Sequence, residues 1–268
     1  MSYTAETLPE GRRRLAQLTK AGGDIIRIED AARILDLDGA SAAKMLARWT
    51  NQGWLRRVSR GAYAVASLDS LESEHVLSDP WILAPVLFDP CYIGGRTAAE
   101  HWDLTEQIFN DIVIFTAQRF RTKSAKKHGI TFNLKHIDDS KLFGMTAVWR
   151  DHTKVMVSDA HRTVIDMLDD PASGGGIRHV ADCLAQYFKR DDHDARKLIE
   201  YAERLGNGAV FKRLGFLIEN DPERQALADA CLERLTKGNA KLDPALDCPR
   251  LATRWKLWVP EFWSHNSA

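Results

Sequence analysis

Residues 41–67, SAAKMLARWTNQGWLRRVSRGAYAVAS, decide the fold of the N-terminal part of this chain. Four apolar residues in the first ten positions have the i, i+3, i+4, i+7 spacing of one helix face: Ala42, Met45, Leu46 and Trp49. The opposite face carries hydrogen-bond donors and positive charge: Ser41, Lys44 and Arg48. The spacing predicts a helix with one buried side and one side free to bind a partner.

Two short extended runs, Trp54–Val58 and Ala62–Ala66, follow this helix and are joined by Ser59-Arg60-Gly61. The glycine can adopt the positive φ of a tight hairpin turn. The major groove of DNA admits a helix of this size, and a basic hairpin beside it can reach the flanking phosphates. The helix and hairpin therefore indicate a surface for double-stranded DNA.

The preceding residues supply the other parts of such a domain. A weak amphipathic helix is expected over Glu10–Lys20, a brief extended run over Asp24–Ile28 and a second helix from Glu29 to Asp36. The run Leu37–Ala40 is the turn before the Ser41 helix. This order is typical of a winged helix-turn-helix, and we expect it to occupy residues 1–67.

The candidate DNA contacts are donors and cations on the outward face of the Ser41 helix, on the hairpin and on the first helix. They are Ser41, Lys44, Arg48, Arg56, Arg57, Arg60, Arg12 and Arg13. Winged helices also serve as protein docking modules, which is the alternative interpretation. The lack of an acidic residue among the outward positions of the helix and hairpin favours DNA.

Charge is divided unequally along the 268 residues, although the net charge is zero. The first 66 residues carry 11 Lys and Arg against 7 Asp and Glu, a net charge of +4, and the remainder carries −4. A basic front part on an acidic body fits a protein that touches a polyanion at one end, although a chance fluctuation would look the same.

Composition predicts a soluble cytoplasmic protein, with 44% apolar and 28% charged residues. The longest apolar stretch, Trp81–Phe88, contains Pro85 and is too short to span a membrane, and we find no signal sequence. The cysteines are isolated, so neither a disulfide framework nor a zinc site is expected: Cys91, Cys183, Cys231 and Cys248.

The remaining chain predicts an acidic linker over residues 68–80 and a C-terminal domain over residues 81–268. Apolar and alternating runs predict strands first, including a buried strand at Asp111–Thr116 and a hairpin around Arg150–Lys154. After Gly174-Gly175-Gly176 the pattern predicts helices only, with an edge strand in the tail near Thr253–Val259. Strands followed by a helical bundle indicate an α+β class with a mixed α/β C-terminal domain.

Several segments of this C-terminal part resemble the AbiEi-type antitoxins of the AbiE abortive-infection toxin–antitoxin systems. The core block of that family is similar to Tyr92–Gly95, Ala98–Gln107 and Asp111–Thr116, and its helical block to Tyr201–Asn207 and Arg213–Glu219. The resemblance implies an autoregulatory transcriptional repressor that binds repeats upstream of its own operon. It also implies that the C-terminal domain counters a nucleotidyltransferase-like toxin, functionally and without a stable complex, in defence against phage.

No cofactor and no catalytic residues are expected. Asp139-Ser140-Lys141 matches half of a nuclease signature, which is common by chance. The densest Asp/His cluster fits no metal-ligand spacing and is more typical of a helix cap: Asp151, His152, Asp159 and His161. The alternative function is a metal-dependent nuclease or transferase that the winged helix targets to nucleic acid.

Five cations between residues 119 and 127 form a second basic segment: Arg119, Arg121, Lys123, Lys126 and Lys127. It is either a solvated hairpin tip or a second contact for nucleic acid or a partner. The late aromatics are expected to pack in the core or at a sheet edge, with an interaction patch as the alternative: Trp255, Trp258, Phe262 and Trp263.

Overall fold

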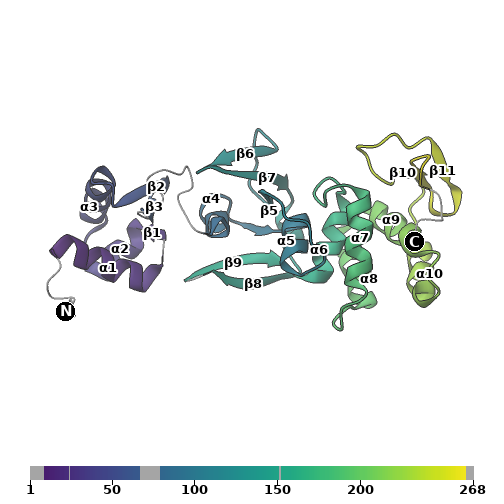
Figure 1. The fold of residues 1–268 in the computed structure, drawn as a ribbon, viewed down its shortest axis with the longest axis horizontal. Coiled ribbons are helices and arrows are strands. Elements are labelled where there is room, and N and C mark those ends of the chain that lie inside the picture. The colour runs from purple at the N-terminus through teal and green to yellow at the C-terminus, as the bar shows by residue number, and fades with distance from the viewer. Residues whose placement is uncertain (1–8, 24, 67–78, 151, 264–268) are drawn as a thin grey trace.

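The computed structural model describes residues 9–23, 25–66, 79–150 and 152–263. The molecule is elongated, with the N-terminal helices and sheet at one end, a larger sheet in the middle and most of the C-terminal helices at the other end (Figure 1). Residues 68–78, most of the segment expected as a linker, lie outside the described residues. Asp79 and Pro80, at the end of that expected linker, instead begin the next helix, because the Asp79 carboxylate accepts a hydrogen bond from the Trp81 amide.

The N-terminal part has the expected order of elements. They are α1 (Glu10–Gly22), β1 (Ile25–Arg27), α2 (Ile28–Leu35), α3 (Gly39–Asn51), β2 (Leu55–Ser59) and β3 (Ala62–Val65). The three strands are antiparallel in the order β1-β3-β2, so the hairpin joins the short strand that precedes α2. This pairing is consistent with a winged helix-turn-helix.

Helix α3 begins where the sequence provides a cap. Asp38 accepts a hydrogen bond from the Ser41 amide at 2.9 Å and another from the Ser41 hydroxyl at 2.6 Å. The apolar stripe predicted for this helix is buried, and the residues between α2 and α3 turn through a left-handed conformation at Asp36. A three-residue turn therefore sets the angle between the two helices.

A six-stranded mixed sheet forms the centre of the C-terminal part. Its strands are β4 (Cys91–Ile93), β5 (Asp111–Thr116), β6 (Ser124–Lys127), β7 (Ile130–His136), β8 (Met145–Arg150) and β9 (Thr153–Ser158). Their order is β6-β7-β5-β4-β9-β8, with β5 parallel to β7, β4 parallel to β9 and the other pairs antiparallel. The buried strand and the hairpin predicted from the sequence are β5 and β8–β9.

Both faces of this sheet are covered. One face packs on the short helices η3 (Pro80–Leu83) and α4 (Ala84–Leu87), which contain most of the apolar stretch Trp81–Phe88. The other face lies toward α6 (Ala160–Asp169), which contacts α5 (Gly95–His101). The run of apolar residues in β5 is explained by this double burial.

The helical part contains α7 (Ile177–Tyr187), α8 (Ala195–Leu205), α9 (Gly208–Ile218), η5 (Pro222–Arg224) and α10 (Gln225–Glu233). The chain then returns to strands: β10 (Ala240–Lys241), β11 (Arg250–Ala252) and β12 (Leu257–Val259). The tail strand expected at an edge is wrong in position, because β12 is the central strand of this small sheet and Thr253–Trp255 is a 3-10 turn. The coarse α+β class is confirmed. Trp255 is fully buried, as expected, whereas Phe262 is half exposed.

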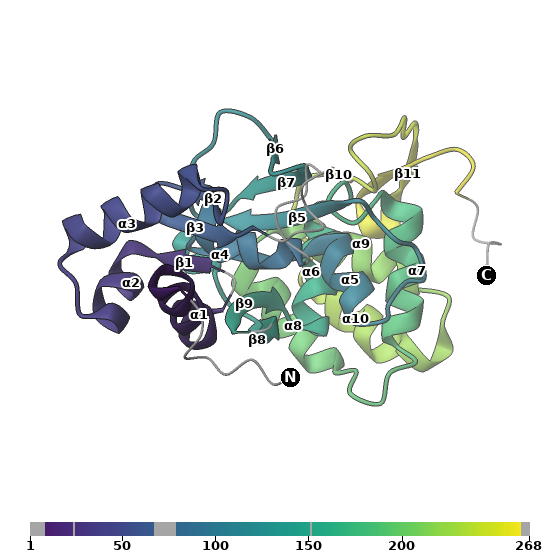
Figure 2. The ribbon, with the colours of Figure 1, turned by 60° about the vertical axis from the view of Figure 1, so that its left-hand side comes forward.

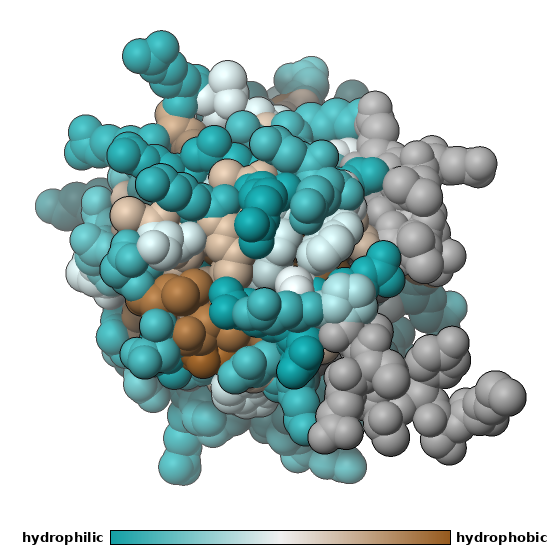
Figure 3. All heavy atoms as spheres, turned by 90° about the vertical axis from the view of Figure 1, so that its left-hand side faces the viewer, coloured by the Kyte–Doolittle hydropathy of each residue, from teal (hydrophilic) through white to brown (hydrophobic). Residues whose placement is uncertain are grey.

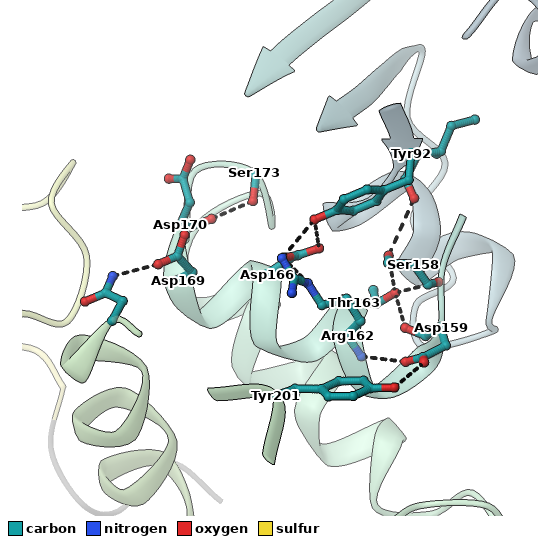
Figure 4. A network of polar contacts seen from close by, with 12 residues as sticks. Tyr92, Ser158, Asp159, Arg162, Thr163, Asp166, Asp169, Asp170, Ser173 and Tyr201 are labelled. Carbon is teal, nitrogen blue, oxygen red and sulfur yellow. Dashed lines mark hydrogen bonds and ion pairs between the residues drawn. The ribbon is translucent and has the colours of Figure 1, made fainter. Parts of the chain in front are cut away.

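A buried ionic network fixes α6 to β4 (Figure 4). Arg162 Nε lies 2.8 Å from Asp166 Oδ1, and the Tyr92 hydroxyl donates to Asp166 Oδ2 at 2.9 Å. The side chains of Arg162 and Asp166 are 0% and 1% exposed. Burial raises the pKa of Asp166 to about 6, against the opposing effect of the Arg162 charge.

The N-terminal sheet has apolar residues on both faces. One face packs under α1–α3 through Ile26, Leu55 and Tyr63. The other face packs on the C-terminal part and belongs to the same core as η3, α4 and the six-stranded sheet; its residues are Ile25, Val58, Ala62 and Ala64. Figure 2 shows the N-terminal sheet beside α4 and the larger sheet. The two parts of the chain therefore share a core.

Within the described ranges, every helix is too short or too polar to cross a lipid bilayer.

Candidate nucleic-acid interface

The outward face of α3 is arranged as the sequence predicts. Lys44 and Arg48 are exposed on the side opposite the buried stripe, and neither makes an ion pair with any residue that the structure describes. Long cationic side chains in this state can reach phosphates and the edges of bases. The middle of α3 is therefore accessible to a partner.

Ser41 lies on the same face, but its hydroxyl donates to Asp38. This hydrogen bond lowers the pKa of Asp38, so the carboxylate is ionised at the N-terminus of α3. A negative charge at this position repels phosphate. Of the three α3 candidates, Ser41 is thus held by the helix cap, while Lys44 and Arg48 extend from it.

A hollow of about 360 Å³ borders this face of α3. It is lined by Arg14, Leu37, Ser41, Lys44, Met45 and Arg48. Arg14 was not among the sequence candidates, because the sequence shows no register between α1 and α3 that would bring it here. Arg14 forms an ion pair with Glu10 at 2.6 Å, in which both side chains are well exposed, so water screens the attraction.

The other two candidates on α1 occupy different surroundings. The Arg12 guanidinium lies 5.6 Å from the centre of the Trp54 ring, at the start of the hairpin, and is thereby linked to the region just after α3. Arg13 is exposed to solvent.

The β2–β3 hairpin presents its arginines outward to different extents. Arg60 is exposed beside Gly61, whose φ of 81° makes the tight turn that the sequence predicts. Arg57 is exposed, and its Nε donates to the Ser59 carbonyl at 3.2 Å. Arg56 is partly buried and already has a partner. The hairpin tip is therefore more accessible than its base.

The surface at this end of the molecule suits a polar partner. In the view onto the N-terminal end, most side chains are hydrophilic, and one hydrophobic area interrupts them (Figure 3). Protein–DNA interfaces are more polar than protein–protein interfaces. The hydrophilic side chains of this end are compatible with a polar partner such as nucleic acid.

The second basic segment is divided among different surroundings. Ser124–Lys127 is the edge strand β6, not a loop, because it pairs with β7. Arg121 and Lys123 line a pocket over β7, and Lys126 lines a different hollow near Trp81. Arg119 and Lys127 are exposed and lie outside both. The five cations therefore do not form one contiguous tip.

Two of the residues considered for catalysis, Asp159 and His161, have structural roles. Asp159 caps α6 by accepting from the Arg162 amide, and it also accepts from the Tyr201 hydroxyl. The His161 Nδ1 is hydrogen-bonded to the Tyr187 hydroxyl, and burial lowers the pKa of His161. Asp151 lies outside the described residues. Within the described part of the chain, no three His, Cys, Asp or Glu side chains are grouped to hold a metal ion.

Comparison with known proteins shows that the N-terminal part is similar to one family. Residues 13–66 match the family described as a transcriptional regulator, AbiEi antitoxin, which confirms the resemblance inferred from the sequence. The segments that first indicated this resemblance, between residues 92 and 219, lie outside the matched range. No curated protein matches the chain.

One solved structure shares the fold over most of its length. The crystal structure of the RV2827C protein from Mycobacterium tuberculosis superposes with a TM-score of 0.60. The alignment covers 93% of this chain and 91% of that one, at 17% sequence identity. At this identity the similarity concerns the fold alone.

Proposed function

Because residues 13–66 are of the AbiEi antitoxin type, we propose that this protein is an autoregulatory transcriptional repressor that binds operator DNA. In this proposal the N-terminal part is a winged helix-turn-helix. Helix α3 enters the major groove, and the β2–β3 hairpin lies against the flanking backbone.

The observation that carries the proposal is the state of Lys44 and Arg48. Both are exposed at the centre of α3 and have no ion-pair partner among the residues described. Arginine can form two hydrogen bonds with guanine in the major groove, and lysine can neutralise a phosphate or contact the same base. We assign base recognition to Arg48 with Lys44, and phosphate contacts to Arg57 and Arg60.

We further propose that the C-terminal part counters a nucleotidyltransferase-like toxin, in an abortive-infection system that limits phage. This part of the proposal is supported by the family of residues 13–66 and by the resemblance in the core and helical blocks. We infer that the effect does not require a stable complex between the two proteins.

The test of DNA binding is a mobility-shift titration with the sequence upstream of the operon and with an unrelated duplex. Binding to the operator should weaken with salt, with a slope of about −0.9 for each phosphate neutralised. Lys44→Ala with Arg48→Ala should remove the preference for operator. The matched control is Arg121→Ala with Lys123→Ala, which loses the same charge elsewhere. Equal operator preference in the wild type and the Lys44/Arg48 variant would refute the assigned role of α3.

The test of antitoxin function is co-expression with the neighbouring toxin gene. The full chain should restore growth, and the Lys44/Arg48 variant should do so equally well when both genes are driven by foreign promoters. Failure of the full chain to restore growth would remove the antitoxin part of the proposal and leave the repressor part intact.

A further inference from the structure

A basic pocket lies over β7, away from the candidate operator interface. Its volume is about 750 Å³, within the range of pockets that hold small molecules. The charged and titratable side chains that line it are Arg96, Arg121, Lys123, Lys135, His136 and Asp170. Four certain cations against one carboxylate make the lining strongly positive.

The position of this pocket follows from the unequal length of two paired strands. Strand β6 pairs with β7 only as far as Asn133, which leaves the last residues of β7 at the edge of the sheet. The chain before β6 crosses this edge and is held there because the Leu134 amide donates to the Lys123 carbonyl at 2.8 Å. The backbone of Lys123 is thereby held at this edge, and Arg121, Lys135 and His136 line the same pocket.

The cations in the basic pocket are not all neutralised within the protein. Arg96 pairs with Asp111, and Lys135 Nζ lies 2.8 Å from Asp170 Oδ2. Arg121 and Lys123 have no side-chain partner among the described residues, and both are exposed. The Nε of Arg96, another residue that lines the pocket, is buried and has no hydrogen-bond partner among the described residues. These groups leave a site for an anion that brings its own acceptor oxygens.

An aromatic side chain completes the lining. Phe120 borders the basic pocket with 38% of its surface exposed, while it packs edge to face on Phe88. An exposed aromatic ring beside cations is the combination on which nucleic-acid bases stack while phosphates are neutralised. A plain inorganic anion would use the cations and leave the ring unused.

We propose that the basic pocket binds a nucleoside phosphate, with the phosphate on Arg121 and Lys123 and the base against Phe120. The same chemistry is offered by a free nucleotide and by the 5′-phosphorylated end of a single strand. This site is separate from the operator contacts on α3, so the proposal goes beyond repression.

The test is calorimetric titration of the full chain with 5′-AMP, adenosine, inorganic phosphate and a six-nucleotide single strand with or without a 5′ phosphate. AMP or the phosphorylated strand should bind at least about tenfold more tightly than its unphosphorylated counterpart. If AMP binds, the site can take a free nucleotide as its ligand. If only the phosphorylated strand binds, the site takes strand ends. Binding of neither overturns the proposal.

Two pairs of substitutions distinguish binding in the basic pocket from non-specific attraction to positive charge. Arg121→Ala with Lys123→Ala should lower the affinity for whichever ligand binds at least about tenfold. Arg119→Ala with Lys127→Ala removes the same charge from the same segment outside the pocket and should change binding less than about threefold. Equal losses in the two variants would show non-specific attraction and refute the site.

A third variant tests the base. Phe120→Leu should lower the affinity for AMP about fivefold or more and leave the affinity for inorganic phosphate unchanged, provided that the melting temperature is retained. An equal effect on both ligands would contradict stacking on Phe120. Operator binding by the Arg121/Lys123 variant should equal that of the wild type, so failure of this site and failure of the operator site give different results.

Discussion

The His128 Nε2 lies 3.0 Å from the backbone carbonyl oxygen of Val58, which connects the β6–β7 turn to the hairpin strand β2. Val58 also places its side chain in the core that β2 shares with the C-terminal part. The hairpin proposed to bind DNA is thus supported from behind by both a polar and an apolar contact. Two of the predictions below depend on this support.

Val58→Ala in the full chain should lower the free energy of unfolding by about 1–2 kcal/mol, because it removes two buried methyl groups from the shared core. The measurement is urea denaturation followed by circular dichroism. Arg60→Ala, on the exposed tip of the same hairpin, is the matched control and should leave stability within about 0.5 kcal/mol of the wild type.

A fragment of residues 1–66 should keep its preference for operator over unrelated DNA, since the exposed face of α3 is intact. Its melting temperature should be lower than that of the full chain, because the apolar side of its sheet faces water. Mobility shift and thermal melting of the fragment check the two expectations. A fragment that binds both duplexes equally would show that the C-terminal part is needed to position α3.

Asp38→Asn should tighten DNA binding and lower stability less than Asp38→Ala. The amide oxygen can still cap α3, while the negative charge at the start of the helix is lost. Asp38→Ala loses both the cap and the charge and should lower the melting temperature. The depressed pKa of Asp38 gives the sign of the pH effect: its contribution to stability is present above the ordinary value of 3.8 and is lost as pH falls through the lower pKa of the folded state.

Arg162→Met should lower the free energy of unfolding by about 3–5 kcal/mol at pH 8, since the buried Asp166 would then either carry an unpaired charge or have to take up a proton. The folded-state pKa of Asp166, about 6, is above its ordinary value of 3.8. The folded state therefore keeps a proton that the unfolded chain releases in this window, and stability falls as pH rises through it. Removal of Arg162 raises this pKa further, so the loss should be smaller at pH 5 than at pH 8.

Denaturation of the Arg162→Met variant at both pH values measures this difference. Arg162→Met combined with Asp166→Leu replaces both charges and should recover much of the lost stability. A loss of equal size at both pH values would contradict the role given to the Asp166 proton.

Gly215→Ala should prevent stable folding or lower the melting temperature strongly. A methyl group at this position of α9 would overlap the ring of Trp255, which is fully buried and donates its indole N–H to Glu219 at 2.6 Å. The matched control is Gly238→Ala, where no atom lies within 4 Å of the added carbon. Thermal melting of both variants checks the contrast.

Local sequence patterns predicted the N-terminal part well. The stripe from Ala42 to Trp49 and the glycine turn at Gly61 are each encoded within a few residues, so periodicity and turn chemistry were enough to order the elements. The exposure of Lys44 and Arg48 follows from that stripe. Arg14 was missed because its place beside α3 depends on how two helices pack, which no short pattern records.

The C-terminal part was predicted less completely, because its contacts join distant residues. The strand order β6-β7-β5-β4-β9-β8 includes a parallel pair between Ile93 and Val157, and the ionic pair Arg162–Asp166 reaches back to Tyr92. A charge within a predicted helix usually indicates a solvated side. Arg162 departs from that rule because its Nε donates to Asp166 and its Nη2 donates to Tyr92 within the core.

The two-sided N-terminal sheet limits how the proposed DNA specificity could be re-engineered. A chimaera with a foreign N-terminal domain would need apolar residues equivalent to Ile25, Val58, Ala62 and Ala64, because these pack against the C-terminal part. Substitution of only the outward positions of α3 leaves this packing contact unchanged. Changes in the proposed DNA specificity should therefore be made by substituting Lys44 and Arg48, not by replacing all of residues 1–66.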